Sequence, residues 1–123
     1  MGSKGISPKN GFTLIEVMMV VVIIGILFMM AINLTLNMRK KAFIVSIEND
    51  LSKTYKLSLY YYALEQDGII DLANLKELGY NPSPGVKLDV VDGSEKNLKI
   101  TGRHENIIGV ICQIDMNGVI TTQ

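Results

Sequence analysis

Two hydrophobic patterns follow each other along the chain. From Phe12 to Ile32 nearly every residue is apolar, and Glu16 is the only charged residue in that stretch. About 20 consecutive apolar residues are enough for a helix to span a bilayer. The first pattern therefore predicts a membrane-spanning helix with one carboxylate near its start.

Glu16 gives this segment a second role, because a charge inside lipid costs a few kcal/mol and a simple anchor has no reason to carry one. A cleaved secretory signal does not explain it either. Such signals end in a cleavage site made of small residues, and residues 33–41, which follow the apolar run, contain no such site. The sequence thus indicates an anchor that also does something else.

The second pattern, from Phe43 to Tyr62, is amphipathic. Apolar residues recur there every three or four positions, as on one face of a helix, and residues 12–66 contain no proline. The expected face consists of Phe43, Ile44, Ile47, Leu51, Tyr55, Leu59 and Tyr62. Asp50 is expected on another face, in a weak surface pair with Lys53. One continuous helix of about 55 residues is predicted, and its second half is expected to pack on a C-terminal sheet.

Turn signals and short apolar runs predict the elements of residues 67–123. Asp67-Gly68 is expected to end the long helix. A short helix should begin after Asp71 as N-cap and end at Gly79.

Strand candidates occupy residues 86–90, 98–101 and 107–114, and Asn117-Gly118 is a strong two-residue hairpin signal. The expected fold class is α+β. A long N-terminal helix with a protruding hydrophobic half carries a small antiparallel sheet of three or four strands on its C-terminal half.

Composition argues against an enzyme. The 123 residues carry 12 basic and 12 acidic side chains, so net charge gives no case for nucleic acid or for an anionic membrane surface. With one histidine and one cysteine, little material exists for a catalytic or metal site. Cys112 is expected in the core and His104 in a solvated turn. Asp89, Asp92 and Glu95 fit no EF-hand spacing. No metal, cofactor or small-molecule substrate is expected.

The segment Lys9-Asn10-Gly11-Phe12-Thr13-Leu14-Ile15-Glu16-Val17 resembles the processing site of type IV prepilins and pseudopilins. The resemblance implies a leader, residues 1–11, which a prepilin peptidase removes by cleaving after Gly11. The same enzyme would then methylate the new amino group of Phe12. The remaining divisions would be a transmembrane and filament-core helix (12–38), its amphipathic continuation (39–66) and a head (67–123) with the type IV pilin fold.

The resemblance also implies a reason for Glu16. In a filament of identical subunits, the Phe12 ammonium of one subunit can pair with the Glu16 carboxylate of a neighbour. Because a buried charge is tolerated when its partner is supplied, such a pair would favour the correct axial register. The residues assigned to the filament core by this resemblance are Val20, Ile24, Gly25, Leu27 and Phe28.

The family resemblance leaves several alternatives open. The leading one is a type IV pilus subunit, held in the bacterial inner membrane with its head in the periplasm and then exported into an extracellular pilus by an assembly platform with its ATPase. The others are a type II secretion pseudopilin, in a periplasmic pseudopilus, and a minor pilin. Twitching motility, adhesion, DNA uptake and electron export all remain possible roles. Orientation follows from the resemblance alone, because the basic residues 39–41 mildly favour the opposite topology.

Two departures from the family matter. Many pilins carry a proline where this chain has Asn33, so melting of the helix around Gly25–Asn33 is left open. The chain also lacks the paired cysteines that some pilins use to close a C-terminal loop.

Overall fold

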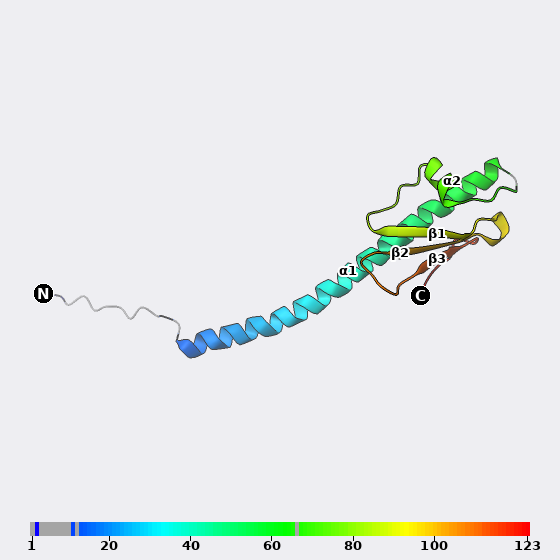
Figure 1. Ribbon diagram of the computed structural model, residues 1–123. Coiled ribbons are helices and arrows are strands. Elements are labelled where there is room, and N and C mark those ends of the chain that lie inside the picture. The colour runs from blue at the N-terminus through cyan, green and yellow to red at the C-terminus, as the bar shows by residue number, and fades with distance from the viewer. Residues whose placement is uncertain (1, 3–10, 12, 66) are drawn as a thin grey trace. The chain divides into compact units, whose positions relative to one another are not determined.

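A computed structural model describes residues 2, 11, 13–65 and 67–123 (Figure 1). It contains two α-helices, α1 (Leu14–Leu64) and α2 (Leu72–Glu77), and a short 3₁₀ turn, η1 (Glu95–Asn97). The four strands are β1 (Val86–Asp92), β2 (Lys99–His104), β3 (Cys112–Asp115) and β4 (Ile120–Thr122). By its internal contacts the chain divides into two units, Met1–Asn37 and Met38–Gln123. From here on, the head means this second unit, which includes the C-terminal half of α1 as well as residues 67–123.

Helix α1 is continuous for 51 residues, as the absence of proline predicts. The polar residues after the apolar run do not break it. Asn33 Nδ2 donates to the Met29 carbonyl at 3.1 Å, and Thr35 Oγ1 donates to the Ala31 carbonyl at 2.8 Å. Such bonds to the preceding turn satisfy the side chains within the helix itself. In this structure the segment is therefore helical through Asn33.

The amphipathic face of α1 is only partly the predicted one. Ile47, Leu51 and Tyr62 are buried as expected, but Leu59 is exposed, so its assignment to this face is wrong. Three polar residues at four-residue spacing, Asp50, Thr54 and Ser58, are fully buried instead. The expectation that Asp50 lies on an outer face is also wrong. Its burial depends on partners in another segment, which periodicity does not reveal.

The turns between α1 and the sheet follow the sequence signals. Asp67 adopts a left-handed backbone with φ of 66° just beyond the helix. Asp71 caps α2, accepting a bond from the Asn74 N–H, while the Asn74 side chain returns a bond to the Asp71 N–H. At the other end Gly79 has φ of 99°, and Tyr80 N–H donates to the Leu75 carbonyl, which is a Schellman motif.

The sheet is an antiparallel meander with the order β1-β2-β3-β4. The strand predicted over residues 107–114 is wrong for residues 107–111, because β3 begins only at Cys112 and Ile108 lies in a turn. A run of apolar residues does not by itself distinguish a strand from an apolar loop. Asn117-Gly118 does form a hairpin turn, but its loop has three residues, since Asp115 N–H donates to the Val119 carbonyl.

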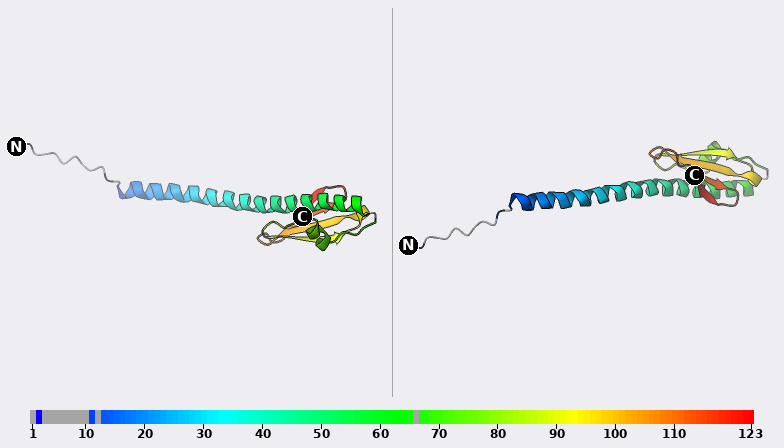
Figure 2. Two further views of the ribbon diagram at one scale, coloured as in Figure 1. Left: turned by 90° about the horizontal axis from the view of Figure 1, so that it is seen from above. Right: turned by 90° about the horizontal axis from the view of Figure 1, so that it is seen from below.

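The inner face of the sheet packs on the head half of α1, as both views in Figure 2 show. Gly102 of β2 lies close to this helix: a Cβ there would lie 2.6 Å from Ile47 Cγ2 of α1 and 2.6 Å from Leu88 Cδ2 of β1. At the far end of the sheet, the Tyr62 hydroxyl donates to the Gly93 carbonyl at 2.7 Å. The α+β class, with a long helix and a four-stranded antiparallel sheet packed against it, is confirmed.

Candidate functional site: an assembly segment at the N-terminus

The helix start that carries Glu16 is built by a local cap. Thr13 precedes the first helical residue, and its Oγ1 accepts a hydrogen bond from the Glu16 backbone N–H at 3.4 Å. Thr13-x-x-Glu16 is also the spacing of a capping box, in which the acidic residue lies in the first turn. A carboxylate there is stabilised by the positive end of the helix dipole. Thr13 is therefore the residue that caps α1, and Glu16 lies in the first turn that it caps, an arrangement that the sequence analysis did not predict.

Glu16 shares one face of α1 with several of the proposed core residues. Val20 and Ile24 follow it at four-residue intervals, and Leu27 comes three residues after Ile24. Residues three and four apart lie above one another on a helix. The carboxylate thus stands at the end of an apolar row, where a cation on a partner could reach both the charge and the row.

Side chains of the N-terminal unit leave a large apolar surface uncovered. Every large apolar residue of α1 from Leu14 to Met38 that the structure describes is between 45% and 79% exposed. An 18-residue stretch of α1 has a mean hydropathy of 2.9. By length and composition, the helix is able to cross a membrane. Soluble monomers rarely expose contiguous apolar surface of this extent, so the helix needs lipid or other helices around it.

Gly25 has no reason to be glycine within this single chain. It lies inside α1, and a Cβ added there meets nothing within 4 Å. Glycine in a helix interior costs roughly 0.5–1 kcal/mol relative to alanine. Its flanking residues Ile24 and Ile26 are exposed as well, so this part of the helix is open to close approach by a neighbour.

The predicted processing site is only partly visible. Gly11 is exposed and lies outside any regular element. Phe12, which carries the predicted cleavage, methylation and pairing roles, lies outside the described residues. Its relation to Glu16 stays a prediction.

The head contains a polar cluster that the sequence reading missed, centred on Asp50. The Asp50 carboxylate is fully buried and accepts bonds from Ser83 N–H at 2.7 Å, Ser83 Oγ at 2.7 Å and the Tyr80 hydroxyl at 3.3 Å. Burial and the Asp50 carboxylate raise the pKa of Tyr80 above its usual value. The cluster ties the segment after α2 to the long helix. The signal in the sequence that could have predicted this cluster is the four-residue spacing of Asp50, Thr54 and Ser58.

The predicted position of His104 is also wrong. The residue is 5% exposed rather than in a solvated turn, and its ring stacks on Phe43 with centroids 4.3 Å apart. Its Nδ1 accepts a bond from the Asn106 N–H at 3.1 Å. The turn signal around it was correct, but a turn can be closed by packing its first side chain inward.

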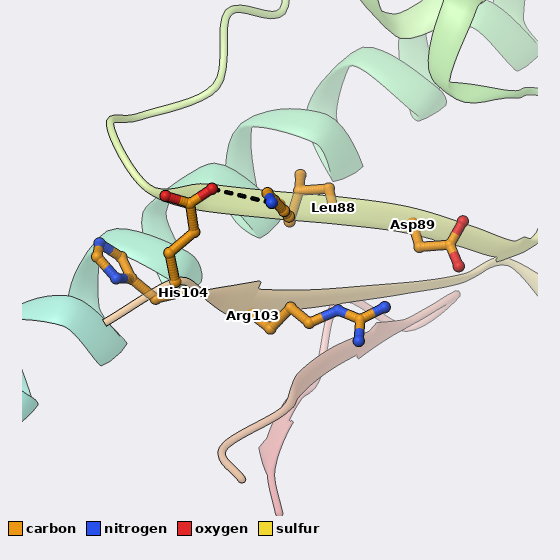
Figure 3. Close-up of a pocket in the computed structure, with 6 residues that line it drawn as sticks. Leu88, Asp89, Arg103 and His104 are labelled. Carbon is orange, nitrogen blue, oxygen red and sulfur yellow. Dashed lines mark ion pairs between the residues drawn. The ribbon is translucent and has the colours of Figure 1, made fainter. Parts of the chain in front are cut away.

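A shallow hollow lies on β1 and β2 beside His104 (Figure 3). It is lined by Lys87, Leu88, Asp89, Arg103, His104 and Glu105. Lys87 Nζ bonds Glu105 Oε1 at 2.9 Å, and this bond holds the pKa of Glu105 below its ordinary value. Both partners are more than half exposed, so the pair is a surface salt bridge of small energetic weight.

The described residues of the head also bear on the expectations for a metal site and for Cys112. In the part of the chain that the structure describes, no three His, Cys, Asp or Glu side chains are grouped so as to hold a metal ion. Cys112 is fully buried, as predicted, with Sγ 3.6 Å from Thr122 Oγ1. A buried thiol of this kind behaves as a small core residue.

Comparison with known proteins bears on the N-terminal segment alone. Residues 6–32 match the family model described as the prokaryotic N-terminal methylation motif. No curated protein matches the chain. The matched residues include Gly11, Phe12 and Glu16, and they end within the apolar half of α1. The chain therefore carries the prepilin signature of type IV pilins and pseudopilins.

Proposed function

We propose that the chain is the precursor of a type IV pilus subunit, a structural protein that polymerises through the N-terminal half of α1. The observation that carries this is the prepilin signature over residues 6–32 on a helix whose apolar side chains are uncovered. A helix of this kind is stable in two settings, a bilayer and a bundle of its own copies. A subunit that moves from membrane to filament needs both.

Processing would supply the cation that Glu16 requires. Cleavage after Gly11 by a prepilin peptidase creates a free amino group on Phe12, which the same enzyme methylates. N-methylation keeps the amine basic, so the new terminus stays cationic. Residues 1–11 would be the leader, and the partner of Glu16 would be the Phe12 terminus of another subunit.

Filament packing would then bury the row that begins at Glu16. Val20, Ile24, Leu27 and Phe28 would lie against neighbouring helices, and Gly25 would allow one of them to approach closely, as small residues do in membrane helix pairs. Apolar burial would supply cohesion. An unpaired carboxylate would penalise any register in which Glu16 misses its partner.

The remaining partners and locations belong to the same proposal. The precursor would sit in the bacterial inner membrane, with residues 12–38 in lipid and the rest of the head, residues 39–123, in the periplasm. An assembly platform and its ATPase would provide the work of extraction. The mature subunit would be found in an extracellular pilus.

Fractionation of the native cells tests this proposal against a type II secretion pseudopilin or a minor pilin. A pilus subunit is expected as the main component of filaments sheared from the cell surface. Glu16→Ala should abolish or strongly reduce these filaments, while Glu48→Ala, in the head part of α1, should not. Recovery of the processed chain only from membranes, with surface fibres made of another protein, would support the pseudopilin or minor-pilin alternative.

A further inference from the structure

The loop between β2 and β3, residues 105–111, displays an isoleucine with almost no protein around it. Ile108 is 99% exposed and Ile111 is 47% exposed. The loop is held at both ends by hydrogen bonds. Ile107 N–H donates to the His104 carbonyl at 3.1 Å, and Ile111 exchanges two backbone bonds of 2.9 Å with Gln123. Ile108 thus projects from a loop whose two ends are bonded to His104 and Gln123.

His104 places this loop beside Phe43, close to the first residues of the head. His104 is the last residue of β2, immediately before the loop (Figure 3). Its imidazole stacks on Phe43. Phe43 follows Met38, the last residue of the apolar segment, by five residues, which is about 7.5 Å along a helix. Each head-group layer of a bilayer is about 5–8 Å thick. If the apolar segment ends at the hydrocarbon boundary, the Phe43–His104 contact lies at the depth of the head groups.

Charge at this end of the head suits an anionic lipid surface. Arg39, Lys40 and Lys41 are exposed on α1 between the apolar segment and Phe43. The one carboxylate of the loop, Glu105, is paired with Lys87 at 2.9 Å. Basic residues next to a membrane span are attracted to anionic lipid head groups.

We propose that, in the membrane-anchored precursor, the β2–β3 loop inserts Ile108 into the interfacial layer of the bilayer while Arg39, Lys40 and Lys41 contact anionic head groups. This inference rests on the proposed membrane-anchored state. A second copy of the chain is the weaker occupant, because a stable protein interface buries about 800 Å² on each partner. One fully exposed isoleucine and its partly exposed neighbour provide much less apolar surface than that.

Such a contact would hold the head on the membrane until assembly. The loop, the basic residues and the apolar segment would face the same bilayer, so the head could not tumble freely about the span. Extraction into a filament would withdraw Ile108 from lipid together with the apolar helix.

Tryptophan fluorescence in brominated vesicles tests the proposal directly, because the natural chain contains no tryptophan. The full chain would be reconstituted into vesicles of phosphatidylethanolamine and phosphatidylglycerol with bromine on the acyl chains. Ile108→Trp reports on the loop. Ile69→Trp is the matched control: Ile69 is 72% exposed, and it follows the end of α1, which lies 21 residues beyond Phe43. At 1.5 Å per residue that is about 30 Å along the helix. Phe28→Trp reports on insertion of the span.

The expected result is at least about twofold loss of Ile108→Trp emission relative to unbrominated vesicles, since an interfacial side chain lies about 5–10 Å into the boundary with the acyl chains. Ile69→Trp emission should not change, and Phe28→Trp emission should be strongly quenched. Replacing Arg39, Lys40 and Lys41 by glutamine should weaken quenching of Ile108→Trp and leave that of Phe28→Trp intact.

Three results would overturn the proposal, and they have different meanings. If Phe28→Trp is quenched and Ile108→Trp behaves as Ile69→Trp does, the chain is anchored but the loop is not in lipid. If Phe28→Trp is also unquenched, the membrane-anchored state itself fails. If Ile108→Trp emission shifts to the blue with rising protein density but bromine has no effect, the loop contacts a second copy of the chain.

Discussion

Replacing Asp50 by alanine should destabilise the head much more than replacing an exposed charged residue of the head. The carboxylate is the shared acceptor for Ser83 N–H, Ser83 Oγ and the Tyr80 hydroxyl. It is fully buried, whereas the Lys53 side chain, 3.9 Å away, is 63% exposed. The lysine therefore adds little. The three hydrogen bonds determine the effect.

The loss of unfolding free energy can be estimated from the hydrogen-bond donors that lose their acceptor. Hydrogen bonds to a charged group contribute about 1.5–3 kcal/mol each, and a buried donor without a partner costs about 1–3 kcal/mol. Part of this is offset, because Asp50→Ala also removes the cost of burying a carboxylate. We expect a net loss of about 3 kcal/mol for Asp50→Ala and about 1 kcal/mol for Ser83→Ala, which removes one bond and keeps the backbone donor. A small domain has about 5–15 kcal/mol in total.

Urea unfolding of the full chain in detergent, followed by near-ultraviolet circular dichroism, measures this change. All five tyrosines lie in the head, so the signal reports on the head alone. The control is Asp89→Ala, an exposed carboxylate on β1, which should change stability by less than about 0.5 kcal/mol. Equal effects of Asp50→Ala and Asp89→Ala would refute the reasoning. So would an Asp50–Ser83 double-mutant cycle with no coupling.

Three further predictions concern the head. Tyr62 has its pKa raised to about 12 by burial and by the nearby Asp92 carboxylate. Its neutral form is favoured by folding, so the stability it contributes is complete below pH 10 and is lost as pH rises through about 12. Unfolding midpoints measured from pH 8 to 12 should show this, with a smaller decrease in Tyr62→Phe. Gly102→Ala should cost about 1–3 kcal/mol by overpacking against α1, measured by thermal unfolding. Gly93→Ala should cost more, because its Cβ would lie 1.8 Å from the Ile70 carbonyl oxygen and backbone cannot yield as a side chain can.

Local signals in the sequence predicted most of the fold. The apolar run and the unbroken helix depend on composition along one continuous segment, and the cap at Asp71 and the Asn117-Gly118 turn depend on residues that are close in sequence. The antiparallel sheet was also predicted, and in it each strand pairs with the next strand along the chain. These features are confirmed because propensity and pattern agree with the tertiary structure at each of them.

Features that depend on distant partners were missed. Asp50 is buried because Ser83, 33 residues later, folds back to it. His104 is buried because Phe43 lies opposite it across the packed helix and sheet. Residues 107–111 have the composition of a strand but form a loop, and their exposure had no local sign. Periodicity assigns a residue to a face without identifying what covers that face.

The sequence predicted which residues form the candidate site, but not how they are arranged on the helix. The pattern around Gly11, Phe12 and Glu16 is specific enough to match a family model. The capping role of Thr13 and the common face of Glu16, Val20 and Ile24 required the helix start to be placed. The intersubunit pair lies beyond one chain and remains a proposal.

Intact-mass and fragment-ion spectrometry of filaments sheared from the native cells tests the central claim most directly. The account predicts a main component that begins at Phe12, lacks residues 1–11 and carries one methyl group on its terminal nitrogen. A chain that retains its leader in cells with an active prepilin peptidase would contradict the account, because the Phe12 amine proposed as the partner of Glu16 would never form.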